Sequence, residues 1–524
     1  MLTINSALDR TRRLYGQRTA IIDRERTFTW NEFCDRVARA ASVLQSLGVK
    51  RGDRFATLCR NTFRNNELLY AGYWMGAVPV PINYRLAPPE IRYILDNASC
   101  KVLAVETVFL DFLKAEPLSP WRDSALLVAE TPLNSPLKQY EALMAKAQPA
   151  PMHDAKEEDD AILLYTGGTT GRSKGVQLTH RNVFGDSIQT SLVVGFQPDD
   201  SYLHVAPMFH SADLLGMGMT LLGASHAFLP QFTGKAFLEA VRDYRITKTM
   251  LTPTMVIMAL QEPDFDKYDL SSLRQFMYGS SPMAVEWIRR ALERFKGVDI
   301  IQGYGLTETS PILTILGMDA HVEALKTGDF TRLRAAGQPI IGVDMRILDD
   351  RGREVPTGEI GEVVVRGANV TRGYLGRPED NAAAFRNGWF HTGDVGRLDE
   401  QGFLFLLDRK KDMIITGGEN VYSSEVEAII YQHPKVHECA VVGVPDDRYG
   451  EALLAAVVVA PGKTLTQDEL IEHCRGKIGG YKIPRRMVFL EALPKSAMGK
   501  ILKTELRRAY SGEAPAQSPA AKAS

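Results

Sequence analysis

Strand-like apolar runs alternate with amphipathic helical patterns along most of this 524-residue chain, and this alternation limits the fold more than any other feature. The runs typical of strands occupy residues 54–59, 78–82, 161–165 and 248–251. Apolar residues at the three- and four-residue spacing of a helix occupy residues 65–75, 88–97, 235–245 and 284–295. Repeated strand–helix–strand units predict an α/β protein in which mostly parallel sheets are covered by helices.

The pattern changes twice further along the chain. Residues 337–365 hold short strand-like runs separated by Gly and Pro, which predicts a small β-rich subdomain. The charged cluster at 408–412 has the composition of an exposed linker, and the strands and helices of a smaller α+β unit follow it. We therefore expect a large N-terminal domain over residues 1–407 and a small mobile C-terminal domain over residues 408–510. The polar tail, 511–524, is expected to be disordered.

Charge and cysteine content exclude several classes of protein. Lys and Arg total 62 against 63 for Asp and Glu, so no large surface of one sign is indicated and nucleic acid is not an expected partner. The five cysteines are scattered without a CxxC pair, which argues against a zinc site or disulfide framework and favours the reducing cytoplasm. Residues 214–234 lack charged side chains but contain Gly, His and Pro, and so predict a buried helix and strand rather than a transmembrane segment.

The segment YTGGTTGRSKG (165–175) follows a strand-like run directly and is the strongest indication of chemistry. Its glycines let a ligand approach the backbone N–H groups, its Thr and Ser residues add hydroxyl donors, and Lys174 adds a positive charge. This combination suits a polyphosphate. The spacing is not that of a Walker A loop, and a flexible surface loop would have a similar composition.

Five further segments complete a resemblance to the adenylate-forming superfamily, which includes acyl- and aryl-CoA synthetases, firefly luciferase and the adenylation domains of peptide synthetases. In chain order they are YGSSP (278–282), QGYGLTE (302–308), WFHTGDVG (389–396), DRKKDMIITGGENVYSSEVE (408–427) and PKSAMGKILK (494–503). The phosphate loop of this family typically reads YTSGTTGxPKG, from which the chain departs at Gly167 and Ser173. Both departures are expected to loosen the loop.

The resemblance implies a nucleotide site. The residues that it implies for ATP and AMP are Thr166, Gly167, Gly168, Thr169, Thr170, Gly171, Ser280, Gly303, Tyr304, Asp394 and Arg409. Tyr304 is expected against adenine and Thr307 at the α-phosphate. Asp394 would accept hydrogen bonds from both ribose hydroxyls, and Arg409 would contact the same sugar. Glu308 is expected to hold Mg²⁺, a hard ion that takes oxygen ligands from protein, phosphate and water.

The same resemblance implies two functions for the small domain. Lys411 is the implied hinge residue, and the backbone at Gly417 and Gly418 would line the CoA tunnel. Lys500 is implied to enter the site for adenylation. Without the resemblance, the lysines would be interpreted as solvated charges and the two glycines as a turn. The implied catalytic residues are Lys174, Thr307, Glu308 and Lys500.

The implied reaction joins a carboxylic acid to CoA through an acyl-adenylate, with ATP, Mg²⁺ and CoA as co-substrates and cofactors and with release of AMP and pyrophosphate. The carboxylate attacks the α-phosphorus of ATP, and catalysis of this step is mainly positioning and charge neutralisation. The small domain would then rotate about Lys411 so that the CoA thiol takes the place of Lys500. No cysteine nucleophile is required.

The segment PMFHSADLLG (207–216) is the expected acyl pocket. Its residues are His210, Ser211 and Ala212, joined by Gly303. His210 is either a gate or a core histidine satisfied by hydrogen bonds. Asp213 either contacts a polar substituent of the substrate or caps the following helix. The small side chains leave room for an extended or a flat acyl group.

A small carboxylic acid and CoA are therefore the expected partners, and the acid is expected to be a medium- or long-chain fatty acid. The main alternative is an aryl or arylpropenoyl acid such as a benzoate, coumarate or ferulate. Two weaker alternatives are the loading of a carrier-protein thiol and a nucleotide-binding protein without activity. A homodimer is an expectation by analogy alone, because no interface is legible in the composition.

Overall fold

The computed structural model describes residues 1–24, 26–166, 173–410, 412–446, 448–495 and 501–511. The chain divides into two compact units. Unit 1 comprises Met1–Met345, Val365–His391 and Gly402–Leu404. Unit 2 comprises Arg346–Val364, Thr392–Gln401 and the chain from Phe405 onward.

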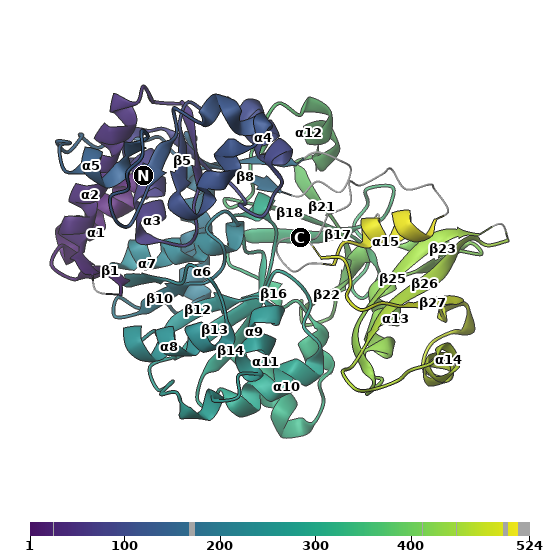
Figure 1. Cartoon of the computed structure of the whole chain (residues 1–524). Coiled ribbons are helices and arrows are strands. Elements are labelled where there is room, and N and C mark those ends of the chain that lie inside the picture. Colours follow the sequence, from purple (N-terminus) through teal and green to yellow (C-terminus); the bar gives the residue numbers. More distant parts are fainter. Residues whose placement is uncertain (25, 167–172, 411, 447, 496–500, 512–524) are drawn as a thin grey trace. The chain divides into compact units, whose positions relative to one another are not determined.

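Among the described residues, unit 1 contains a nine-stranded sheet in which the strands from β14 to β1 run parallel (Figure 1). Its strands, in spatial order, are β16 (Gln338–Pro339), β15 (Thr314–Leu316), β14 (Asp299–Tyr304), β13 (Gln275–Gly279), β12 (Lys248–Leu251), β10 (Ser201–His204), β11 (Ser225–Phe228), β1 (Thr19–Asp23) and β2 (Arg26–Thr29). The strands at both edges, β2, β15 and β16, pair antiparallel.

Two smaller sheets complete unit 1. A parallel sheet consists of β4 (Val78–Pro81), β3 (Arg54–Leu58), β5 (Leu103–Glu106), β6 (Leu126–Val128) and β7 (Lys138–Gln139). An antiparallel sheet consists of β19 (Gly373–Tyr374), β9 (Lys174–Thr179) and β8 (Asp160–Thr166). The phosphate-loop sequence begins in β8 and ends in β9, and Thr166 pairs with Lys174 across this hairpin.

Helices cover these sheets. They are α1 (Ile4–Tyr15), α2 (Trp30–Ser46), α3 (Phe63–Met75), α4 (Pro88–Asn97), α5 (Tyr140–Met144), α6 (His180–Val194), α7 (Met217–Leu222), α8 (Gly234–Tyr244), α9 (Pro253–Leu260), α10 (Val285–Arg294), α11 (Met318–Thr327) and α12 (Pro378–Ala384). Helix α2 begins at a capping box, in which Thr29 and Glu32 satisfy each other's backbone N–H groups. Apolar side chains such as Leu238 on α8 and Ile288 on α10 pack against Phe276 of β13 to form the core beside the large sheet.

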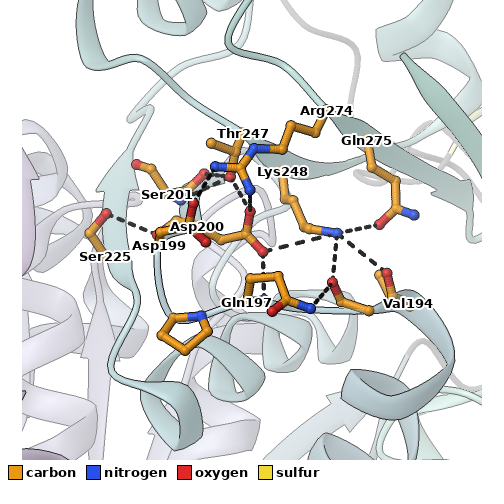
Figure 2. A network of polar contacts seen from close by, with 12 residues as sticks. Val194, Gln197, Asp199, Asp200, Ser201, Ser225, Thr247, Lys248, Arg274 and Gln275 are labelled. Atoms are coloured by element: carbon orange, nitrogen blue, oxygen red, sulfur yellow. Dashed lines mark hydrogen bonds and ion pairs between the residues drawn. The ribbon is translucent and has the colours of Figure 1, made fainter. Parts of the chain in front are cut away.

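A buried polar network anchors the amino ends of three parallel strands (Figure 2). Lys248, the first residue of β12, donates to the carbonyl oxygens of Val194 and Gly195 at 3.3 Å each and to Gln275 Oε1 at 3.0 Å. The Lys248 ammonium thus donates to carbonyl oxygens at the end of α6, where a helix has no N–H groups of its own to bond them. Burial lowers the pKa of Lys248. The network lies at the edge of the sheet opposite the strand ends discussed below, so we regard it as structural.

Unit 2 is built on the long antiparallel pair β25 (Val436–Asp446) and β26 (Gly450–Val459). The remaining strands of this sheet are β23 (Ile414–Thr416), β24 (Glu419–Val421) and β27 (Arg486–Phe489), and the helices are α13 (Ser423–Ile430), α14 (Gln467–Cys474) and α15 (Lys503–Tyr510). Successive side chains of a strand point to opposite faces. Val441 accordingly packs with α13 and α14, whereas Val442 packs with Leu506 of α15.

A further sheet contains β17 (Val343–Leu348), β18 (Gly361–Gly367), β21 (Trp389–Leu398), β20 (Phe385–Arg386) and β22 (Leu404–Arg409). The division between the two units falls within four of these strands, β17, β18, β21 and β22. The single boundary expected between residues 407 and 408 stays a prediction.

The predicted α/β class, with mostly parallel sheets and a separate smaller α+β unit, is confirmed. Residues 214–234 form α7 and β11, as the Gly, His and Pro residues indicated. Every helix in the described part of the chain is too short or too polar to cross a membrane.

The expectation that 408–412 is a solvated linker is wrong in part: Arg409 ends β22, and Asp412 is buried in an ion pair of 2.7 Å with Arg507 of α15.

Candidate functional site

The carboxyl ends of three parallel strands of the large sheet lead into the segments that carry the sequence motifs. Strand β10 ends at His204, β13 at Gly279 and β14 at Tyr304. The acyl-pocket segment 207–216, Ser280 and the Thr307–Glu308 pair therefore all follow the same edge of the sheet. Open α/β sheets bind ligands outside the carboxyl ends of their strands, which makes this edge the candidate site.

Glycines bring β13 and β14 together at this edge. Gly279 is directly opposite Gly303, and a Cβ on Gly279 would collide with the carbonyl oxygen of Gly303. A Cβ on Gly303 would press against the Met277 sulfur. Ser280 follows with φ +69°, in the left-handed region, and its side chain is exposed, while Tyr304 is half-buried. The strand ends thus present backbone and small side chains to any ligand.

Backbone contacts fix the short turn η5 (Thr307–Thr309) that carries Glu308. The Thr371 N–H donates to the Glu308 carbonyl at 2.8 Å. The buried Asn369 amide donates to the carbonyls of Thr309 and Ile312 at 3.0 and 2.7 Å. Because these contacts come from the β18–β19 connection, the position of Glu308 depends on a segment far from it in sequence.

The Glu308 carboxylate belongs to a cluster of polar side chains beside the phosphate-loop hairpin. The Tyr374 hydroxyl donates to Glu308 Oε1 at 2.9 Å, and the Lys174 ammonium lies 5.1 Å from the centre of the Tyr374 ring. Lys174 in turn pairs with Asp380 Oδ1 of α12 at 2.6 Å. The fold therefore brings two sequence-predicted residues, Lys174 and Glu308, to either side of Tyr374. Sequence reasoning missed both Tyr374 and Asp380.

In the acyl-pocket segment, Ser211 is joined to the motif of Glu308, since its hydroxyl lies 3.1 Å from Thr307 Oγ1. His210 is half-buried, and its Nδ1 accepts from the Ala212 N–H at 3.2 Å. Ala212 is buried. Asp213 does not cap α7, because that helix begins after Gly216 without a side-chain cap. Instead Asp213 Oδ1 lies 2.7 Å from His204 Nδ1.

Asp213 ends a buried chain of hydrogen bonds that runs into the core. His204 Nε2 lies 2.9 Å from His226 Nδ1, and His226 Nε2 lies 3.1 Å from Thr220 Oγ1. The Thr220 hydroxyl also contacts the Tyr70 hydroxyl. Burial lowers the pKa of His226 well below its usual range, so this ring is neutral, and one of its nitrogens donates a hydrogen bond while the other accepts one. The chain ties the acyl-pocket segment to α3, α7 and β11.

Unit 2 holds the other residues that the resemblance implies for the nucleotide. The Arg409 guanidinium lies 2.7 Å from Asp394 Oδ1 and donates to the Thr392 carbonyl at 3.2 Å. Asp394 is buried on β21 and Arg409 ends β22. Gly417 and Gly418 have φ +60° and +85° and link β23 to β24, so they form the tight turn that two glycines indicate. Both conformations are ones that a side chain would disfavour.

Several predicted residues lie outside the part of the chain that the structure describes. They are Gly167, Gly168, Thr169, Thr170, Gly171, Lys411 and Lys500. Their roles stay predictions from the sequence. Two predicted residues of the phosphate-loop segment that the structure does describe, Thr166 and Lys174, are both half-buried and pair with each other across the β8–β9 hairpin.

The donors around Glu308 fit the Mg²⁺ ion that the resemblance implies. The carboxylate is a hard oxygen donor held in place through Oε1. Among the described residues, no group of three His, Cys, Asp or Glu side chains is arranged to hold a metal by itself. A single carboxylate suits an ion that takes its other ligands from phosphate and water.

Comparison with known proteins places the chain in a family. Residues 8–375 match the model of the AMP-binding enzymes, and residues 425–500 match that of the AMP-binding enzyme C-terminal domain. A feruloyl-CoA synthase of Amycolatopsis is 38% identical over 508 residues, 96% of this chain and 98% of the relative. A long-chain-fatty-acid–CoA ligase of Mycobacterium tuberculosis is 34% identical over 481 residues, covering 91% and 92%. The crystal structure of ATP-bound MatB from Rhodopseudomonas palustris superimposes with a TM-score of 0.87 at 31% identity, covering 97% and 99%.

These findings define an enzyme that activates a carboxylic acid at the expense of ATP. The chain belongs to the AMP-binding enzymes, the adenylate-forming family that its motifs resemble. It is an AMP-forming acid–thiol ligase that uses ATP, Mg²⁺ and CoA.

Proposed function

We propose that this ligase converts an aryl or arylpropenoyl acid of the ferulate type into its CoA thioester. The observation that carries the proposal is the 38% identity to a feruloyl-CoA synthase along nearly the whole of both chains. The small side chains of Ser211, Ala212 and Gly303 are compatible with it, because they leave room for a flat ring as well as for an extended chain. This choice replaces the medium- or long-chain fatty acid that was expected from the sequence alone, and the overall reaction stays the same.

The first half-reaction forms the acyl-adenylate. A carboxylate oxygen of the acid bonds to the α-phosphorus of ATP, and the bond from that phosphorus to pyrophosphate breaks. Lys174 would offset the charge of the phosphates, and Thr307 would hold the α-phosphate. Glu308 would hold Mg²⁺, which supplies further charge neutralisation when bound. Tyr374 would keep the Glu308 carboxylate in one orientation, since its hydroxyl is already bonded to Oε1.

The second half-reaction transfers the acyl group to sulfur. The CoA thiolate bonds to the carbonyl carbon, and the bond from that carbon to the AMP oxygen breaks. Asp394 and Arg409 would hold the ribose of the nucleotide, as a buried carboxylate and guanidinium in contact are suited to do. Lys500 would serve adenylation, and rotation about Lys411 would bring Gly417 and Gly418 to the CoA. We assign these motions to a domain of residues 408–510 moving against residues 1–407.

The proposal is tested by AMP release over a panel of acids with and without CoA, with the thioester identified by mass. We expect CoA-dependent turnover with ferulate, coumarate and cinnamate that exceeds turnover with octanoate and palmitate by at least about 10-fold, the discrimination that about 1.4 kcal/mol of differential binding provides. Turnover with fatty acids and not with aryl acids would refute the aryl assignment. Adenylate that accumulates without any CoA turnover would indicate a carrier-protein thiol instead.

A long-chain fatty acid is the second candidate. The 34% identity to a long-chain-fatty-acid–CoA ligase over 91% of this chain is the observation that favours it. The two candidates differ in the shape of the acyl group, so comparing palmitate with ferulate in the same assay separates them. A preference measured as the ratio of kcat/KM values would decide between them.

A further inference from the structure

The Lys174 ammonium has an acidic partner inside this chain. Asp380 Oδ1 lies 2.6 Å from Lys174 Nζ, and the two side chains are 32% and 22% exposed. Lys174 belongs to the phosphate-loop segment and is the cation that the proposed function assigns to the phosphates of ATP. This ammonium is therefore already paired with a carboxylate, and an anionic ligand would have to compete with it.

The structure holds Asp380 in this position through the residue next to it. The Asn381 side chain accepts a hydrogen bond from the Tyr374 N–H at 2.7 Å and donates one to the Tyr374 carbonyl at 3.0 Å. These two bonds clamp α12 to β19, which pairs with β9, the strand that begins at Lys174. The ring of Tyr374 also faces the Lys174 ammonium. Two strands and a helix, β9, β19 and α12, therefore hold Lys174 and Asp380 next to each other.

We propose that Asp380 is an internal competitor for the phosphates of ATP and sets the affinity of the enzyme for its nucleotide. Without nucleotide, Asp380 neutralises Lys174 and keeps its ammonium near Tyr374. When ATP binds, its triphosphate must displace the Asp380 carboxylate from the Lys174 ammonium. The inference rests on the proposed role of Lys174 and goes beyond it, because it assigns a function to a residue outside the sequence motifs.

The size of the effect follows from the exposure of the pair. Ion pairs that are partly exposed contribute little, and their strength is reduced by salt. Removing the competing charge should therefore tighten nucleotide binding by about 2- to 5-fold at low ionic strength. The gain should shrink as salt is added, because screening weakens the Lys174–Asp380 attraction.

The test is the dissociation constant of ATP, measured by isothermal titration calorimetry without acid or CoA, for the wild type and for Asp380→Asn. We expect the variant to bind ATP about 2- to 5-fold more tightly and to show a lower KM for ATP with little change in kcat. Glu379→Gln is the matched control: it removes a carboxylate one residue away on the same helix, where the side chain is exposed, and should leave ATP affinity unchanged. Unchanged or weaker ATP binding by Asp380→Asn would overturn the proposal.

A second pair of variants separates competition from simple repulsion between Asp380 and the triphosphate. In a Lys174→Met background, Asp380→Asn should no longer tighten ATP binding, because the contested ammonium is gone. An equal gain in both backgrounds would show that the carboxylate acts on ATP without Lys174 and would contradict competition. These measurements contain no acid, so a wrong acyl substrate does not affect them. Absence of any ATP binding by the wild type would instead contradict the proposed function itself.

Discussion

The Tyr374 hydroxyl donates a hydrogen bond of 2.9 Å to Glu308 Oε1, and the same tyrosine places its ring 5.1 Å from the Lys174 ammonium. One side chain thus contacts both the carboxylate that we assign to Mg²⁺ and the cation that we assign to the phosphates. If both assignments hold, Tyr374 links the metal-binding and phosphate-binding residues of the site without itself taking part in the chemistry. It follows that Tyr374 is a positioning residue whose effect should be visible in the response to Mg²⁺.

Tyr374→Phe should raise the concentration of free Mg²⁺ that gives half-maximal pyrophosphate release by about 3- to 10-fold, since the loss of one hydrogen bond to a charged group is worth about 1.5 kcal/mol. The Glu308 carboxylate would lose its fixed orientation, so its ordering on binding Mg²⁺ would cost entropy. Pyrophosphate release is measured against free Mg²⁺ at saturating ATP and acid. The expected maximal rate at high Mg²⁺ is close to that of the wild type.

Tyr140→Phe is the matched control for this variant. The Tyr140 hydroxyl also donates to a glutamate, Glu67 Oε2, at 2.9 Å, but both residues are buried in the core. We expect this control to lower the free energy of unfolding by about 1–3 kcal/mol and to leave the Mg²⁺ response unchanged. If both variants shift the Mg²⁺ response equally, Tyr374 acts through general stability and not through Glu308.

The ribose assignment makes a prediction about nucleotide selectivity. If Asp394 accepts hydrogen bonds from the ribose hydroxyls, the wild type should use 2′-deoxy-ATP with a kcat/KM about 10-fold or more below that for ATP. Asp394→Ala should lower activity with ATP and remove most of this preference, because the group that reads the 2′-hydroxyl is absent. The measurement is the ratio of kcat/KM values for the two nucleotides. A preference that survives in Asp394→Ala would assign the ribose contact to another residue.

Much of the fold and part of the site were predictable from local sequence. The helix expected over 88–97 and the strand expected over 248–251 have the observed bounds, because apolar spacing and turn residues act over a few residues. Lys174 and Glu308 were found because they stand in motifs. Their partners were not, since Asp380 is 206 residues from Lys174 and Tyr374 is 66 residues from Glu308, and no local pattern encodes such pairs.

The charged residues at 408–412 show the same limit of prediction from local sequence. Residues 408–412 read as a solvated linker because the sequence shows charge and not its partners. In the structure the Arg409 guanidinium forms an ion pair with Asp394, and Asp412 forms one with Arg507 of α15. Asp213 is a second case, since the sequence indicated either a contact with the substrate or a helix cap, whereas its observed partner, His204, lies on the preceding strand.

Folding stability should fall in mild acid because of His180. Burial lowers the pKa of His180 to about 4, despite the raising effect of Asp159 and with a further lowering effect of His153. The unfolded chain takes up a proton near pH 6.5 and the folded chain does not, so stability is complete above that pH and is lost as the pH falls toward 4. The imidazole accepts from the Ile4 N–H at 3.2 Å, which requires the neutral ring.

The loss attributable to His180 is about 2 kcal/mol between pH 7 and pH 5. It is measured as the difference between wild type and His180→Gln in the free energy of urea unfolding at the two pH values. Glutamine keeps an acceptor for the Ile4 N–H and does not titrate, so the variant should lose less stability than the wild type on acidification. Equal losses in both proteins would mean that His180 is protonated in the folded state.

The buried chain behind the acyl pocket gives the last prediction, which concerns Asp213. Asp213→Asn keeps an oxygen acceptor for His204, whereas Asp213→Leu leaves the His204 ring nitrogen, 2.7 Å from the present carboxylate oxygen, without that partner in the core. We expect Asp213→Leu to lower the free energy of unfolding by about 1–3 kcal/mol and Asp213→Asn to lower it by less.

Because Asp213 belongs to the segment that bears His210, Ser211 and Ala212, the leucine variant should also raise KM for the acid by a larger factor than KM for ATP. Urea unfolding and steady-state kinetics on both variants measure these effects. Parallel increases in the two KM values would show that the chain supports the whole unit and not the acyl pocket in particular.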